Sequence, residues 1–251
     1  MPKLKQRKSR RRKRLKKPKK APKQKAPVEL KDYGFVAVCM GKGITNILKD
    51  LGVDRVIEGG QTMNPSTDDI LKAVKRVKAK TVYVFPNNKN IIMAANQAAE
   101  LVEDKKIVVI PSKSVPQCIS AMVEFNDKKS AEANEKAMNK AIGRVTSGQL
   151  TYAVRDTEID GIEIKKDDIL GMVEGKIVTV GKDIDDVLNR VVSQMVDEDT
   201  EFLNVYYGKE IKKPQADVML KALETKYADD EIEVSFKKGG QPLYYYIISA
   251  E

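Results

Sequence analysis

Three loops in this chain carry amides and hydroxyls of the kind that hold carboxylates or peptide backbones. The candidate residues in these loops are Gln61, Thr62, Met63, Asn64, Asn87, Asn88, Asn90 and Ser112. Each loop follows an apolar run and precedes a helical pattern, which is where open α/β sheets bind their ligands. Such side chains can orient a carboxylate or a partner's backbone, but they can equally satisfy their own loop through Asx-type turns. The residues alone leave both interpretations open.

Groups that make or break bonds are scarce in this sequence. The chain has no histidine, which excludes a Ser-His-Asp or Cys-His mechanism within it. Its two cysteines, Cys39 and Cys118, lie in apolar patterns without metal-ligand spacing, and this favours buried structural thiols over reactive ones. Such cysteine use is typical of a reducing cytoplasm, where we expect the protein. We therefore expect no catalytic residue, no metal and no cofactor in this chain.

The segment Gly41-Lys42-Gly43 lies between a predicted strand and a predicted helix and invites a phosphate-binding interpretation. Backbone N–H groups at the start of a helix attract anions. The full nucleotide-binding pattern GxxxxGK[ST] is absent, however, because no Ser or Thr follows the lysine at the required spacing. A plain turn from strand to helix is favoured, and kinase chemistry by this chain alone is not expected.

The net charge of +10 conceals two parts of opposite sign. Residues 3–25 contain fifteen Lys and Arg and no acid, whereas the remaining chain has 31 basic and 36 acidic residues, a net charge of −5. We expect residues 1–32 to form a disordered basic tail, because like charges repel and little apolar surface is available. The tail could contact nucleic acid or another anionic surface, or be a solvated segment without a partner. No stretch has the roughly 18 to 20 apolar residues of a membrane span.

The sequence after the tail predicts an α/β protein of two lobes, residues 33–143 and 144–251. The continuous apolar run from Gly34 to Cys39 is typical of a buried parallel strand. Strands and helices then alternate as far as Ile142, which predicts a parallel sheet with flanking helices. Beyond this point tight turns join the strands, with a hairpin signal at Asp160-Gly161, and we expect a smaller α+β lobe. Its predicted strands are 149–154, 159–164, 176–180, 202–207, 231–236 and 243–248.

Three segments of the chain resemble one known family. Residues 35–43, 58–67 and 85–90 are similar to the C-terminal domain of the large chain of bacterial fatty acid kinase, which is a multidomain protein related to dihydroxyacetone kinase. The resemblance covers roughly residues 33–251, and its most specific part is the string Gly-Gly-Gln-Thr-Met-Asn-Pro-Ser that begins at Gly59. It implies a two-lobed, DegV-like fold. It also implies that ATP and magnesium bind in a kinase domain that is not present in this chain.

The resemblance implies a non-catalytic docking domain that binds a fatty-acid-loaded, DegV-like carrier for acyl-phosphate formation by kinase domains of the same enzyme. A body with a net charge of −5 would steer a basic partner. The acidic docking candidates are Asp156, Glu158, Asp160, Asp197, Glu198 and Asp199. The alternative is a DegV-like module that itself binds a fatty acid or a small carboxylate between the lobes, held by Thr62 and Asn88. DegV-like carriers surround the carboxylate with a Ser/Thr-rich loop, where this chain has Met63 and Asn64.

Overall fold

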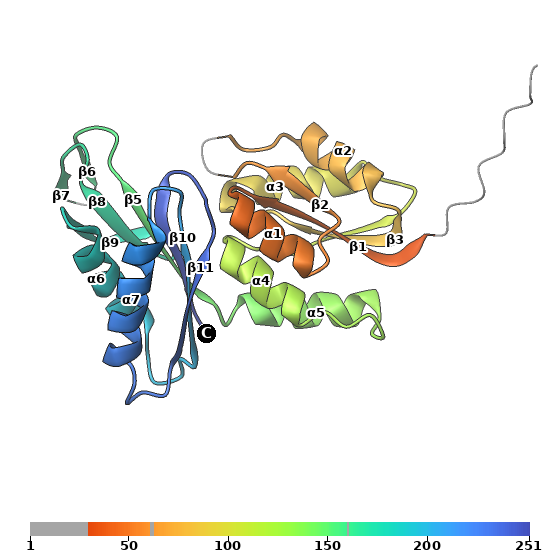
Figure 1. Cartoon of the computed structure of the whole chain (residues 1–251). Coiled ribbons are helices and arrows are strands. Elements are labelled where there is room, and N and C mark those ends of the chain that lie inside the picture. Colours follow the sequence, from red (N-terminus) through yellow and green to blue (C-terminus); the bar gives the residue numbers. More distant parts are fainter. Residues whose placement is uncertain (1–29, 61–62, 160) are drawn as a thin grey trace, which may run out of the picture.

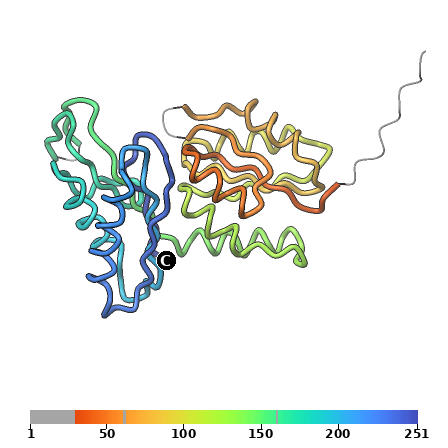
Figure 2. The backbone as a smooth tube through the Cα atoms, viewed as in Figure 1, coloured from red at the N-terminus to blue at the C-terminus, as the bar shows by residue number. Residues whose placement is uncertain are grey.

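The computed structural model of the chain describes residues 30–60, 63–159 and 161–251. These residues form two lobes, each built on one main β-sheet (Figure 1). Lobe 1 contains the described residues up to 143, and lobe 2 contains those from 144 onwards. The backbone passes from lobe 1 to lobe 2 between α5 (Ala131–Ile142) and β5 (Thr146–Tyr152), at the green segment in Figure 2. The proposed boundary between residues 143 and 144 falls in this connection.

Sheet A of lobe 1 is the predicted parallel sheet, with four strands in the order β2-β1-β3-β4. Its strands are β1 (Lys31–Cys39), β2 (Arg55–Glu58), β3 (Ala79–Phe85) and β4 (Lys106–Val109). Its helices besides α5 are α1 (Lys42–Asp50), α2 (Thr67–Arg76), α3 (Lys89–Glu100) and α4 (Val115–Val123). Helices α1, α4 and α5 cover one face, and α2 and α3 cover the other. Because both faces are buried, β1 is apolar at successive positions rather than at alternate ones.

A capping box opens α2. The Ser66 Oγ accepts a hydrogen bond from the Asp69 N–H at 3.2 Å, and the Asp69 carboxylate accepts one from the Ser66 N–H at 3.0 Å. Two backbone donors that a helix start leaves without partners are thereby satisfied. This bonding lowers the pKa of the Asp69 carboxyl, so the carboxylate acceptor is ionised at neutral pH.

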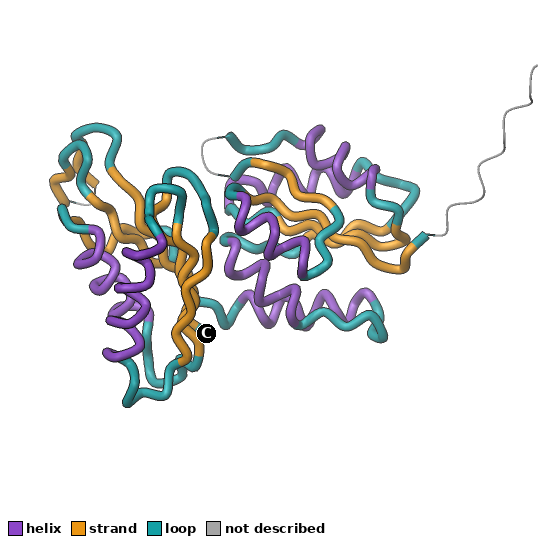
Figure 3. The backbone as a smooth tube through the Cα atoms, viewed as in Figure 1, coloured by secondary structure: helices purple, strands orange, loops and turns teal. Residues whose placement is uncertain are grey.

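Sheet B of lobe 2 has six strands in the order β11-β10-β12-β5-β8-β9, and all neighbours are antiparallel except β10 and β11. The strands besides β5 are β8 (Ile169–Val173), β9 (Lys176–Gly181), β10 (Phe202–Tyr207), β11 (Glu233–Lys238) and β12 (Tyr244–Ala250). Helices α6 (Ile184–Met195) and α7 (Lys213–Lys226) cover the face of sheet B away from lobe 1 (Figure 3). We expected the second lobe to be the smaller one, yet its sheet has more strands than sheet A.

A separate hairpin, formed by β6 (Thr157–Ile159) and β7 (Ile162–Ile164), projects from the end of sheet B. It confirms the hairpin predicted at Asp160-Gly161, although Asp160 itself lies outside the described residues. The sequence did not predict β8, because Gly171 interrupts its apolar pattern. A Cβ at Gly171 would lie 2.4 Å from Val191 of α6, so the glycine lets the helix pack closely against the sheet.

The uncovered face of sheet B packs against lobe 1. Tyr206 of β10 and Ile247 of β12 are buried in the core that α1, α4 and α5 share with sheet A. The loop between β11 and β12 reaches the start of α1, where the Ile44 N–H donates a hydrogen bond to the Gly239 carbonyl at 3.1 Å. Apolar contacts and a backbone hydrogen bond therefore join the two lobes.

Candidate functional site

The strand order of sheet A reverses between β1 and β3, since the chain turns to β2 on one side and to β4 on the other. Open α/β sheets bind ligands in the crevice at such a switch point. In this chain the crevice measures about 20 Å³, because Gln241, Pro242 and Ile247 of lobe 2 enter it. A cavity of that size holds about one water molecule, whereas ligand pockets usually measure roughly 300 to 1,000 Å³. The crevice is therefore closed to a ligand.

Gln241 holds the closing loop in place. Its side chain is buried, and its Nε2 donates a hydrogen bond to the Tyr206 carbonyl at 2.7 Å. The backbone carbonyl of Gln241 in turn accepts a hydrogen bond from the Lys209 N–H at 3.0 Å. Sequence patterns did not single out this residue, because its role depends on how lobe 2 packs against lobe 1.

Asn87 and Ser112, two of the predicted site residues, lie together at the floor of the junction. The Asn87 Nδ2 donates to the Val38 carbonyl at 2.9 Å, and the Asn87 Oδ1 accepts from the Ser112 hydroxyl at 2.6 Å. The Asn87 N–H also donates to the Ser112 Oγ at 3.2 Å. Both side chains are buried. Their polar atoms therefore join the end of β1 to the loops after β3 and β4, and do not form an Asx turn within one loop.

Asn88 and Asn90 follow at the start of α3. The Asn88 Oδ1 accepts a hydrogen bond from the Asn90 N–H at 2.9 Å, and the Asn88 Nδ2 donates to the Gly60 carbonyl. Asn88 is thus both the cap of α3 and a link to the loop after β2. The exposed Asn90 side chain makes no hydrogen bond to the residues that the structure describes.

Met63 and Asn64 of the first loop do not join this group. Met63 and Asn64 line a groove of about 580 Å³ between β2 and α2, and the Met63 side chain is 69% exposed. Gln61 and Thr62 lie outside the described residues, so a role for Thr62 in holding a carboxylate stays a prediction.

An open cleft lies one strand away from the closed crevice, between the loops after β3 and β4 and the uncovered face of sheet B. It measures about 290 Å³ and is lined by Asn88 and Asn90 of lobe 1 and by Gln149 of lobe 2. Ser114 of lobe 1 and Ser147 of lobe 2 also line it, and their hydroxyls are 2.7 Å apart in a hydrogen bond that joins the lobes. The sequence identified the loops of lobe 1 as candidates. It did not identify the residues of β5 that face them, because alternation along a strand does not show which part of another lobe the strand packs against.

The six acidic docking candidates fall into two groups at opposite ends of sheet B. Asp156 and Glu158 belong to the hairpin segment, which follows the end of β5, and Asp160 lies outside the described residues. The other group, Asp197, Glu198 and Asp199, precedes β10, whose first residues lie beside the end of β12 and hence near the start of β5. The length of β5 separates the groups by about 20 Å. A partner would have to span this distance to contact both acidic groups.

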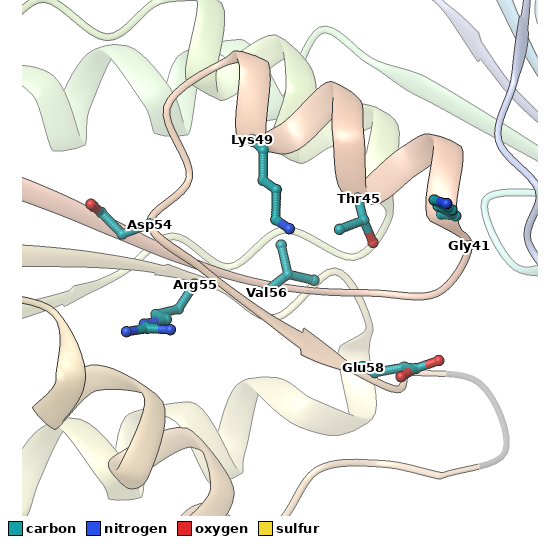
Figure 4. Close-up of a pocket in the computed structure, with 8 residues that line it drawn as sticks. Gly41, Thr45, Lys49, Asp54, Arg55, Val56 and Glu58 are labelled. Carbon is teal, nitrogen blue, oxygen red and sulfur yellow. The ribbon is translucent and has the colours of Figure 1, made fainter.

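A further groove of about 410 Å³ lies between α1 and β2 (Figure 4). Thr45 and Lys49 project from α1 toward Val56 on β2, with Arg55 and Glu58 at either side. Its charges are mixed, and Asp54 is committed to the fold because its carboxylate accepts a hydrogen bond from the Phe35 N–H at 2.9 Å. At the start of α1 the Ile44 N–H is bonded to lobe 2, which supports the plain-turn interpretation of residues 41–43.

The described residues contain no group of three or more His, Cys, Asp and Glu side chains that could hold a metal ion. Both cysteines are buried, and burial raises the pKa of the Cys39 and Cys118 thiols, so neither is an activated nucleophile. Among the helices that the structure describes, none is long and apolar enough to cross a membrane.

The architecture is that of DegV family proteins. A DegV family protein from Corynebacterium glutamicum superposes with a TM-score of 0.62 at 14% identity, covering 88% of this chain and 97% of that one. The fatty acid kinase (Fak) B3 protein of Streptococcus pneumoniae, solved with linoleic acid, gives a TM-score of 0.57 at 10% identity, with 88% and 99% covered. These likenesses define the class of fold.

The family follows from the sequence match. The chain belongs to the FakA-like C-terminal family of fatty acid kinase proteins, whose model matches residues 34–251. Protein YloV of Bacillus subtilis is 49% identical over 225 residues, which cover 90% of this chain and 40% of that protein. The chain thus spans about two fifths of the length of this relative.

Proposed function

We propose that this chain is the docking domain of a fatty acid kinase. It binds a fatty-acid-loaded, DegV-like carrier and presents it to kinase domains elsewhere in the same enzyme, which form the acyl phosphate. ATP and magnesium belong to those kinase domains, and this chain contributes no catalytic group. Docking raises the effective concentration of the carrier at the kinase site.

The closed crevice is the observation that carries this proposal. The chain has the fold of the DegV family, yet Gln241, Pro242 and Ile247 leave only about 20 Å³ at the switch point of sheet A. An acyl chain needs a pocket at least ten times larger, by the usual range of roughly 300 to 1,000 Å³. The alternative function, fatty acid binding by this chain, is therefore disfavoured, and recognition of another protein is favoured.

Of the two acidic groups, the hairpin is better suited to receive a basic partner. Glu158 and Glu163 lie directly opposite each other on β6 and β7, where like charges repel, and Lys165 forms an ion pair with Glu163 but not with Glu158. On the other face Ile159 and Ile162 are also paired, with 40% and 37% of their surface exposed. The hairpin thus presents carboxylates on one face and an exposed apolar pair on the other.

The hairpin is also held rigidly at its base. Ile164 is fully buried, and the Asp168 carboxylate accepts a hydrogen bond from the Lys165 N–H at 2.8 Å. The Asp168 carbonyl accepts another from the Ala153 N–H at 2.9 Å. A partner that binds the hairpin therefore does not have to order it first.

Charge-neutralising variants at the two ends of sheet B test the docking face. We expect Glu158→Gln/Glu163→Gln to weaken binding of the DegV-like carrier about tenfold at low salt, because removing interface charges slows association. The matched variant Glu198→Gln/Asp199→Asn should change it less than about twofold. Calorimetric titration of carrier into the full chain, at low and high salt, measures both. The reverse pattern would move docking to the loop before β10, and no complex with the unaltered chain at low salt would refute docking altogether.

Native mass spectrometry of the chain purified from cells separates docking from lipid binding. We expect the mass of the chain alone, since the crevice has no room for an acyl chain. A co-purified fatty acid would overturn the proposal in favour of the alternative. Contact of residues 3–25 with nucleic acid or an anionic surface lies outside the described residues and stays a prediction.

A further inference from the structure

Four aliphatic side chains lie together on the two outermost strands at one edge of sheet B. These strands are β8 and β9, and the side chains are those of Leu170, Met172, Ile177 and Val180. Leu170 lies opposite Val180, and Met172 lies opposite Ile177. Cross-strand neighbours have Cβ atoms about 4.5 to 5.5 Å apart, and alternate residues of a strand share a face. The four side chains therefore form one surface, which we call the β8–β9 patch.

The β8–β9 patch is on the face of sheet B that packs against lobe 1, but lobe 1 does not reach it. Met172 lies opposite Gln149 of β5, which lies opposite Ile247 of β12, and Ile247 is buried against lobe 1. All four patch residues are half-buried, and none packs in the three apolar cores that the described residues form. The described part of the chain therefore leaves this apolar surface without a partner.

The hairpin proposed for docking is too small to hold a folded carrier by itself. It spans residues 157–164, whereas a specific protein interface involves roughly 20 to 30 residues a side and buries about 800 Å² per partner. The buried centre of such an interface is apolar, and its rim is polar. A carrier that docks at the hairpin must therefore cover neighbouring surface as well, and the apolar centre of the interface has to lie there.

The β8–β9 patch is the neighbouring surface that has this composition. Residues 165–168 join the hairpin directly to β8, and Leu170 is the second residue of that strand. The route from the hairpin across the edge strand β9 to α6 meets a polar groove instead. The residues of α6 that line this groove are Asn189, Arg190, Ser193 and Gln194. Apolar surface therefore continues from the hairpin onto the lobe-1 side of β8 and β9, and not toward α6.

We propose that the β8–β9 patch is the apolar centre of the docking face, and that the hairpin is its charged end. The occupant is the fatty-acid-loaded, DegV-like carrier, which contacts the patch with an apolar surface of its own. The inference rests on the proposed docking function and names the surface that performs it. Because Met172 also lines the open cleft, a carrier seated on the patch covers the mouth of that cleft.

Calorimetric titration of the carrier into the full chain with Met172→Gln/Ile177→Thr tests the proposal. Both residues lie outside the cores, so the variant should fold, which circular dichroism checks. We expect the affinity to fall about tenfold or more, and equally at low and high salt, because salt does not screen apolar contacts. The matched control, Leu101→Gln/Val218→Thr, alters side chains that are 61% and 65% exposed, at the end of α3 and on α7. It should stay within about twofold of the unaltered chain.

Methyl-labelled, unaltered chain mixed with unlabelled carrier gives a second measurement that needs no substitution. Saturation of the carrier should transfer to the methyl groups of Met172 and Ile177 and not to those of Val218. If the unaltered chain forms no complex, docking itself fails, and this inference fails with it. If Glu158→Gln/Glu163→Gln weakens binding and Met172→Gln/Ile177→Thr does not, the β8–β9 patch alone is excluded. A dimer of the unaltered chain that the patch variant abolishes would assign the patch to a second copy, which also overturns the proposal.

Discussion

Replacing Gly43 by alanine should lower the free energy of unfolding by about 3 kcal/mol, the upper end of the usual cost of overpacking. A Cβ at this position would lie 1.7 Å from the Lys238 carbonyl oxygen, which no side-chain rotation can relieve because the obstacle is backbone. The start of α1 and the loop between β11 and β12 must then separate. Urea unfolding followed by circular dichroism measures this change as a shift of the unfolding midpoint, with the slope of free energy against urea concentration unchanged.

Gly143→Ala is the matched control for this substitution. Gly143 ends α5 with φ −77° and ψ −15°, which alanine adopts readily, and the nearest atom to an added Cβ is 3.4 Å away. We expect the free energy of unfolding to change by no more than about 1 kcal/mol. The change can be a stabilisation, because alanine lowers the conformational entropy of the unfolded chain. Equal effects of the two substitutions would contradict the contact between the lobes. Because the displaced loop also carries Gln241 and Pro242, Gly43→Ala should in addition widen the switch-point crevice.

The parallel sheet of lobe 1 could be predicted because local signals there agree with the tertiary structure. The buried run of β1 and the Ser66–Asp69 capping box identify a strand covered on both faces and the residue at which α2 starts. The hairpin at residue 161 was predicted for the same reason, since glycine suits a tight turn between short alternating strands. Where the local preference of a segment agrees with its place in the fold, the sequence alone predicts its structure.

Features that depend on contacts between the lobes could not be predicted. β8 was missed because Gly171 looks unfavourable in a strand until α6 is known to pack against it. Gln241 lies in a loop of lobe 2, and only the packing of that lobe brings it to the crevice of lobe 1. The acidic candidates formed one group by charge, whereas the strand register of sheet B separates them. Distances across a sheet or between lobes are not encoded in residue spacing along the chain.

The junction between the lobes contains a closed crevice at the switch point of sheet A and an open cleft beside it. Residues of lobe 2 fill the place where this type of sheet binds ligands, so the sheet ends serve to hold the lobes together. The hairpin then stands at the far end of sheet B, away from this junction (Figure 1). The hairpin at which we propose carrier docking is therefore separate from the junction between the lobes, and variants of the hairpin should leave that junction unchanged.

Asn87→Ala should lower the free energy of unfolding by about 3 kcal/mol or more, mainly through lost hydrogen bonds and to a smaller extent through backbone strain. Alanine removes the donor to the Val38 carbonyl and the acceptor for the Ser112 hydroxyl, and each buried group without a partner costs about 1 to 3 kcal/mol. Asn87 also has φ 55°, the left-handed region that asparagine tolerates and alanine does not, which adds about 1 kcal/mol.

Asn87→Gly separates these two causes. Glycine loses the same hydrogen bonds but adopts φ 55° without strain, so its destabilisation should be about 1 kcal/mol smaller than that of alanine. Urea midpoints of the two variants, measured at equal slope, give the difference directly. If alanine and glycine were equally destabilising, the backbone conformation of Asn87 would carry no cost. If both were neutral, the bonds from Asn87 to Val38 and Ser112 would not stabilise the loops on which the junction between the lobes depends.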